Sequence, residues 1–172
     1  MARRPGRRNQ PTVQRGVTRP GRYVGREWNV PAISADTGFR VALCYPDVYE
    51  IGMSHYGLQV MYQMLRNVSG VTVERVFAPW PDREAELEKT GKVLCTLESA
   101  TPLSGVDVLC FTLPHELCFT NVLSVMALGG IPLDRDARDS THPFILGGGI
   151  VTMNPLPLDR FFDAFFIGEA ET

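Results

Sequence analysis

The chain has 172 residues, of which 44% are hydrophobic and 21% are charged, and its formal net charge is −2 at pH 7. This length supports one domain with a sizeable core but not two. No apolar run approaches the roughly 20 residues that a membrane-spanning helix needs. The basic N-terminus is not followed by an apolar segment and is therefore not a secretory signal, so we expect a cytoplasmic protein without a membrane partner.

Charge is distributed unevenly along the chain. Residues 1–28 contain eight arginines and one acid, Glu27, whereas the remainder is acidic. Residues 1–22 are rich in Arg, Gly and Pro and poor in apolar side chains, which predicts a disordered tail. An arm that binds nucleic acid is the alternative. Such an arm would have no aromatic side chains for base stacking before Tyr23 and Trp28.

The first predicted strand, residues 41–45, is a short apolar run closed by Pro46, as is typical of a buried strand in a parallel sheet. A polar loop follows. From Gly57 onward, apolar residues recur at helical spacing and predict an amphipathic helix: Leu58, Met61, Tyr62 and Leu65.

Short buried runs predict four further strands, at residues 71–77, 106–113, 144–146 and 164–167. Helices are predicted at residues 83–90, with Asp82 as the N-cap, and at residues 116–128. This alternation predicts an α/β domain with a doubly wound, mainly parallel five-stranded sheet. The predicted core positions are Leu43, Leu58, Leu65, Val108, Leu113 and Ile145.

Open α/β sheets bind ligands outside the carboxyl ends of their strands, so the loops after the strands are candidate sites. Gly147, Gly148 and Gly149 follow the fourth strand, and Gly168 with Glu169 follows the fifth. Glycine lets the backbone approach a ligand closely, although a tight turn also explains three glycines. The first strand is not followed by GxGxxG, and GxxxxGK[ST] is absent, so nucleotide binding through these motifs is disfavoured.

Candidate metal and catalytic groups are sparse. Four cysteines lie singly in or beside apolar runs, without CxxC spacing: Cys44, Cys95, Cys110 and Cys118. This pattern predicts reduced thiols rather than disulfides or a metal site. Asp47 and Glu50 could act as a general acid and base, but a turn-forming Asp and a solvated Glu are the simpler interpretation. No catalytic residue is assigned.

Several long stretches carry a family resemblance: PGRYVGREWN, RVALCYPDVYEIGMSHYGLQVMYQML, ERVFAPWPD, and HPFILGGG followed by NPLPL and FFDAFFIGEAE. Together they resemble the N-terminal part of a family of bacterial radical S-adenosylmethionine (radical SAM) proteins with a cobalamin-binding-like domain. The resemblance implies a flavodoxin-like (Rossmann-like) domain over residues 23–172. In the full-length protein this domain would precede a barrel that carries a 4Fe–4S cluster and S-adenosylmethionine. The cluster motif CxxxCxxC is absent here, so we expect a fragment truncated before the barrel, without radical chemistry of its own.

The resemblance also implies a site that holds cobalamin. Cobalamin-binding domains of the DxHxxG type place the lower cobalt ligand in the loop after the first strand, where this sequence has His55. Met53 replaces the acid that would orient the ring, so we expect a hydrogen-bonded loop histidine and no histidine ligand to a corrinoid. Thr112 is expected to face the nucleotide tail.

The expected contact residues come from the loops at the strand ends: Tyr49, Glu50, Gly52, Met53, Ser54, His55, Thr112, Glu116, Gly147, Gly148, Gly149, Gly168 and Glu169. Such a chain would be an accessory domain whose main partner is its own radical SAM barrel. The alternative is a non-enzymatic interaction module with a vacant corrinoid site, which docks a radical SAM barrel or, through the Arg-rich tail, RNA.

Overall fold

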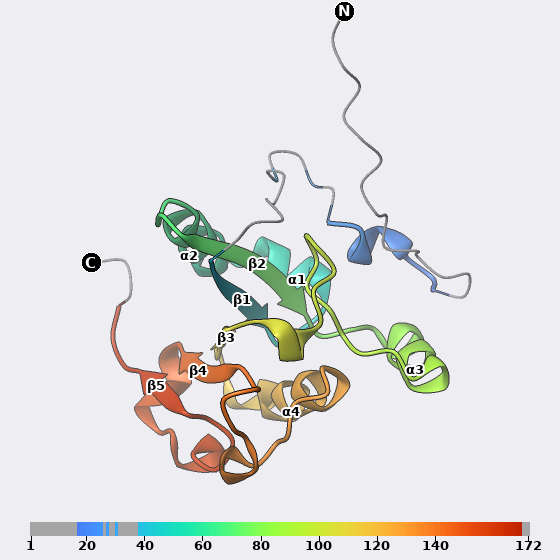
Figure 1. The fold of residues 1–172 in the computed structure, drawn as a ribbon. Helices are drawn as coiled ribbons and strands as arrows, with labels where there is room; N and C mark the ends of the chain where they lie inside the picture. The colour runs from blue at the N-terminus through green and yellow to red at the C-terminus, as the bar shows by residue number, and fades with distance from the viewer. Residues whose placement is uncertain (1–16, 26, 28–29, 31–37, 170–172) are drawn as a thin grey trace, which may run out of the picture.

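A five-stranded, all-parallel sheet forms the centre of the molecule, with strand order β2-β1-β3-β4-β5. The computed structural model describes residues 17–25, 27, 30 and 38–169. The strands are β1 (Phe39–Tyr45), β2 (Val71–Phe77), β3 (Val108–Thr112), β4 (Phe144–Gly148) and β5 (Ala164–Phe166). This order confirms the predicted α/β, flavodoxin-like fold (Figure 1).

Helices cover both faces of the sheet. They are α1 (Tyr49–Ser54), α2 (Tyr56–Arg66), α3 (Pro81–Thr90) and α4 (Phe119–Leu128), with short 3-10 turns between them. In Figure 1, α1 and α2 lie near β1 and β2, whereas α4 lies below β3 and β4. In the sheet, β2 lies on one side of β1, whereas β3, β4 and β5 follow one another on the other side. The strand order therefore reverses between β1 and β3. None of the helices in the described part of the chain has the length and apolar character needed to cross a bilayer.

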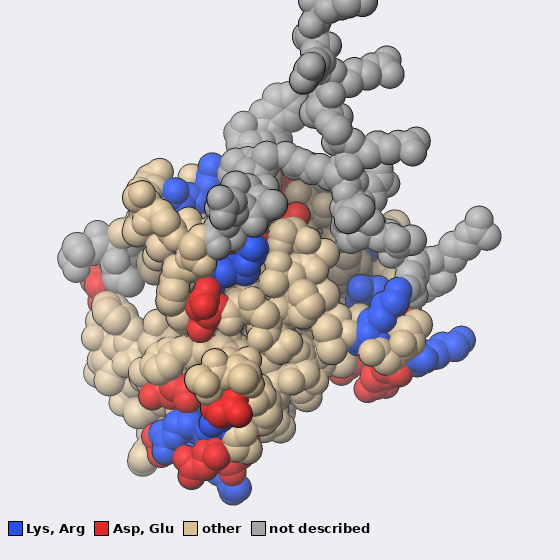
Figure 2. Space-filling view, in the orientation of Figure 1, with Lys and Arg blue, Asp and Glu red and all other residues tan. Residues whose placement is uncertain are grey.

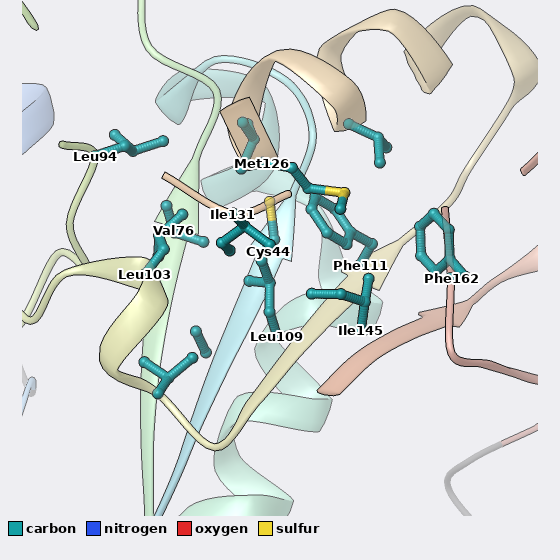
Figure 3. Packing of buried hydrophobic residues seen from close by; sticks show 14 of the residues in the cluster. Cys44, Val76, Leu94, Leu103, Leu109, Phe111, Met126, Ile131, Ile145 and Phe162 are labelled. Atoms are coloured by element: carbon teal, nitrogen blue, oxygen red, sulfur yellow. The ribbon is translucent and has the colours of Figure 1, made fainter. Parts of the chain in front are cut away.

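The larger core lies on the face covered by α3 and α4. Alternate residues of the strands point toward it, among them Cys44, Leu109 and Ile145, and α4 contributes Met126. Figure 3 shows these side chains converging with Phe111 over the sheet. Because strand side chains alternate between faces, the neighbours of these residues point to the opposite face.

The smaller core lies on the other face, under α1 and α2. Leu58 and Tyr62, one helical turn apart on α2, pack against strand residues Leu43, Val73 and Phe77. This core covers β1 and β2 but does not extend over β4 and β5. The predicted apolar stripe of residues 58–65 is therefore confirmed at Leu58 and Tyr62, which are buried, whereas Met61 and Leu65 are partly buried.

Three expectations are corrected. The predicted loop between Pro46 and Gly57 contains the six-residue helix α1. Asp82 is not the N-cap of α3, since Trp80 occupies that position, with Pro81 next to it in the first turn. Leu65 and Val108, predicted as core residues, are only partly buried, because α2 leaves part of its face uncovered.

The N-terminal segment is attached by polar contacts where it is described. The backbone N–H of Thr18 donates to Asp82 at 2.6 Å, and Arg22 donates to Glu50 at 2.8 Å. The end of the predicted tail therefore contacts the α/β domain, while residues 1–16 lie outside the described residues. Figure 2 shows acidic and basic side chains intermixed at the lower end of the molecule.

Candidate functional site

A cavity of about 520 Å³ lies between α2 and the sheet. Its floor is formed by side chains on one face of four strands: Val41, Leu43, Val108, Cys110, Leu146 and Phe166. Met61 and Leu65 of α2 form one wall. The cavity therefore spans the junction of β1 and β3, where the strand order reverses and where open α/β sheets bind ligands.

The cavity exists because α2 covers only part of its face. Val108, Cys110 and Leu146 are partly buried, and Phe166 is 45% exposed. The other long helices of the described chain, α3 and α4, pack on the opposite face. An apolar strip over β3, β4 and β5 is consequently accessible to a ligand.

The mouth of the cavity lies at the carboxyl ends of β3, β4 and β5, where Thr112, Gly148 and Gly168 line it. A Cβ atom built on Gly148 would meet no atom within 4 Å, so this glycine leaves open space. Gly149 has φ +115°, and a Cβ atom there would lie 2.6 Å from the carbonyl oxygen of Leu113. Glycine is therefore required at 149 by the backbone, whereas the space beside Gly148 is open to a side chain or a ligand.

His55 lies between α1 and α2 and caps the second helix. Its Nδ1 accepts a hydrogen bond from the backbone N–H of Leu58 at 3.2 Å. Burial lowers the pKa of the ring below its ordinary value, so the neutral form is favoured. A neutral ring that accepts at Nδ1 carries its proton on Nε2, and that nitrogen has no lone pair free for a metal. The expected hydrogen-bonded histidine is thus present, in the role of an N-cap.

Polar groups are scarce in the cavity. No charged residue is among the described residues that line it, and its polar side chains are His55 and Thr112. Burial raises the pKa of the Cys110 thiol to about 12, so this group stays protonated at neutral pH. The carbonyl oxygen of Gly148 already accepts from the backbone N–H of Leu113 at 2.7 Å. The cavity therefore suits an uncharged, apolar part of a ligand.

The structure brings five of the predicted contact residues together around the cavity: His55, Thr112, Gly148, Gly149 and Gly168. Gly147 points to the other face, where a Cβ atom would lie 2.8 Å from the ring of Phe165. Glu116 and Glu169 are exposed and do not line the cavity.

The remaining predicted contacts lie on α1 and do not line the cavity: Tyr49, Glu50, Gly52, Met53 and Ser54. The hydroxyl group of Tyr49 donates to Glu27 at 2.8 Å. Burial, and then this contact with Glu27, raises the pKa of Tyr49 to about 12. Gly52 lies so close to Phe77 that a Cβ atom would come within 2.4 Å of the ring. The helix α1 therefore anchors the N-terminal segment and packs on β2.

Sequence reasoning missed the apolar walls of the cavity. A signal was available, because Cys110 stands two residues before Thr112 and Leu146 two before Gly148, so each pair shares one face of its strand. Met61, which lines the cavity, belongs to the helical stripe that the sequence predicts. The alternation of side chains along the strands does not indicate which half of this sheet face α2 leaves uncovered.

A second polar cluster lies near β2, away from the cavity. Arg75 is buried and contacts two acids, with its Nε 2.6 Å from Glu98 and its Nη2 3.0 Å from Glu27. The guanidinium also lies 4.8 Å from the ring centre of Tyr62. Because every member of the cluster has a partner, we interpret it as a structural link between the N-terminal segment and the sheet.

Within residues 17–25, 27, 30 and 38–169, no three His, Cys, Asp or Glu side chains come together in a way that could hold a metal ion.

A sequence model of a protein family, described as "Radical SAM proteins, N-terminal", matches residues 57–172. A comparison with curated proteins found no match. The matched region contains α2 without its first residue, Tyr56, all strands from β2 onward, and Thr112, Gly148 and Gly168 at the mouth of the cavity.

Proposed function

Because the chain belongs to the family of radical SAM proteins, as their N-terminal region, we propose that it is an accessory domain that holds a corrinoid at the carboxyl edge of its sheet. Full-length radical SAM proteins use a 4Fe–4S cluster and S-adenosylmethionine. When bound, a corrinoid supplies alkyl-transfer chemistry at its cobalt. The observation that carries the proposal is the cavity that opens between the strand ends at the β1/β3 junction.

The residues present fit such a group. Thr112, Gly148 and Gly168 come from three neighbouring strand ends, so together they offer a broad edge with little side-chain bulk. A corrin ring with its substituents exceeds the cavity volume of about 520 Å³. We therefore assign the cavity to the nucleotide tail and the strand-end loops to the ring. The open space at Gly148 is the clearest sign of a fit, because a side chain there would enter the cavity.

The chain's own residues would bind and orient the ligand. The apolar floor excludes water from the tail, and the hydroxyl group of Thr112 can donate or accept one hydrogen bond at the mouth. The N-cap role of His55 supports binding without a histidine below the metal. The domain would thus position the ligand for another part of the radical SAM protein.

The test is to incubate the purified chain with hydroxocobalamin, remove the excess, and record the visible absorption. The proposal predicts retained colour at a stoichiometry near one. A folded chain that retains no colour would contradict the corrinoid site.

A second function is favoured by a different observation. Large apolar side chains in the connections after β3 and β4 are strongly exposed: Leu117, Ile150, Met153 and Leu156. Leu117, at 87% exposure, follows β3, and the other three follow β4. An interaction module without a corrinoid would use this surface to dock the rest of the radical SAM protein. Binding of a separately expressed barrel domain, weakened by Leu156→Ser and unaffected by hydroxocobalamin, supports this second function.

A further inference from the structure

We propose that the cavity selects corrinoids by the base of their nucleotide tail, accepting a benzimidazole and rejecting a purine. The inference rests on the proposed corrinoid site and adds the chemical class of ligand that the site takes. It follows from the shape of the cavity and from the small number of polar groups in its walls.

The cavity is a long groove along the strands. On β3 it extends from Thr112 at the mouth to Val108, four residues away, a length of about 13 Å. Leu65, near the C-terminal end of α2, lines the same inner part. A flat aromatic base can therefore pass between α2 and the sheet and leave its sugar and phosphate near the mouth.

The inner part of the groove is apolar. Leu43, Val108, Cys110 and Leu146 surround it, and none of them offers a strong hydrogen-bonding group. The thiol of Cys110 is protonated and is a weak donor. A benzimidazole with methyl substituents gains contact with these walls as its apolar surface leaves water.

A purine base would bring polar edges into the same space. Adenine carries an exocyclic amino group and several ring nitrogens, and each needs a partner when it leaves water. The two polar side chains of the cavity lie at its mouth, and the Nδ1 of one of them, His55, is already occupied by the N–H of Leu58. Backbone groups of the floor are hydrogen-bonded within the sheet, where Cys110 of β3 lies in register with Leu146 of β4. A single unpaired polar group weakens binding by about tenfold or more.

The experiment measures dissociation constants of the whole chain for three aquo-corrinoids by equilibrium dialysis with visible absorption. The probes are hydroxocobalamin with its dimethylbenzimidazole base, the corresponding adenine-containing cobamide, and a cobinamide that lacks the tail. The benzimidazole form should bind at least about tenfold more tightly than the adenine form. Equal binding of all three probes would overturn the selectivity and leave the corrinoid site standing. Absence of binding by all three would overturn both proposals.

Two substitutions, with Val68→Phe as their control, locate the preference in the groove. Cys110→Phe fills the inner part with apolar volume and should reduce cobalamin binding to the level of cobinamide, with cobinamide binding unchanged. Val68→Phe adds bulk at an exposed position that does not line the cavity and should leave all three constants unchanged. Leu146→Asn places an amide group in the cavity wall. It should bring the dissociation constants of the benzimidazole and adenine forms closer together, because the amide can pair with a polar edge of adenine. A preference that persists in a folded Cys110→Phe chain would show that the base lies elsewhere.

Discussion

The Nδ1 atom of His55 accepts a hydrogen bond from the backbone N–H of Leu58 at 3.2 Å, so the ring caps α2. The same geometry places the ring proton on Nε2, which is the nitrogen that a metal would require. One contact therefore caps a helix and leaves no lone pair on Nε2 for a cobalt ion in the proposed site.

His55→Ala should destabilise the chain by about 0.5 to 2 kcal/mol, because an N–H at the first turn of α2 loses its partner. His55→Asn keeps a capping acceptor and should restore most of this loss. Urea unfolding of the three chains measures the difference. If bound cobalamin shows the same visible spectrum in all three, the ring is not a cobalt ligand, whereas a spectral shift in His55→Ala would contradict the assignment.

The same cap predicts a pH dependence. Burial lowers the pKa of His55 below its ordinary value of 6.5, so the unfolded chain binds the proton more tightly than the folded chain. The contribution of the cap is therefore fully present above pH 6.5 and is lost as the pH falls through the folded-state pKa. Unfolding free energies measured between pH 5 and pH 8 should show a steeper decline for the wild type than for His55→Asn. Parallel profiles would count against the neutral ring.

Two leucines of α2 should differ in their contribution to stability. Leu58 is fully buried against β1 and β2, whereas Leu65 is partly buried and lines the cavity. Leu58→Ala should cost about 2 to 5 kcal/mol, since it leaves a hole in a closed core. Leu65→Ala should cost about 1 kcal/mol, because part of its surface already faces the cavity. Equal losses in chemical denaturation would show that the cavity is closed.

Substituting Glu98, the buried partner of Arg75, should strongly lower the free energy of unfolding. Glu98→Gln leaves a buried guanidinium without its nearest charge and should cost about 3 to 5 kcal/mol. Glu27→Gln is the matched control, because Glu27 contacts the same arginine but is 19% exposed where Glu98 is 1% exposed. Its effect should be clearly smaller, and the reverse order of the two effects would contradict the assigned roles.

The N-terminal segment should contribute to stability only through its last residues, which contact the α/β domain. Deleting residues 1–16 should leave the melting temperature nearly unchanged, since so few apolar side chains cannot offset the cost of ordering. Extending the deletion through Tyr23 should lower it, because the contacts of Thr18 with Asp82 and of Arg22 with Glu50 are lost. Equal melting temperatures for the two deletions would contradict the second expectation. With single-stranded RNA as a probe, the shorter deletion should remove the salt-dependent part of any binding.

Much of the fold could be predicted because it follows from local patterns. The apolar run of β1 and the β-branched residues of β2 identify these strands, and the predicted range of β2 matches the observed one. The helix α1 could not be predicted in this way. It has six residues, includes Gly52, and has no side-chain cap, so its stability comes from packing against Phe77 and from contacts with the N-terminal segment.

The site was only partly predictable for a related reason. Period-two spacing identifies which residues share a face of a strand, and topology identifies the edge where ligands bind. Neither indicates whether a helix covers that face. The sequence therefore predicts Val108 and Leu65 as core residues. They lie beside an open cavity because α2 covers only part of the sheet face, which the sequence does not indicate.

Hydroxocobalamin retention by the wild type, Gly148→Phe and Gly21→Phe tests the proposed corrinoid site most directly. Both glycines have open space where a Cβ atom would lie, but Gly148 lines the cavity and Gly21 lies in the N-terminal 3-10 turn (Pro20–Tyr23). A corrinoid held at the carboxyl edge of β4 predicts retained colour in the wild type and in Gly21→Phe, and none in a Gly148→Phe chain whose melting temperature shows that it is folded. Equal colour in all three chains would contradict the proposed site, because the ligand would then be held away from the carboxyl edge of β4.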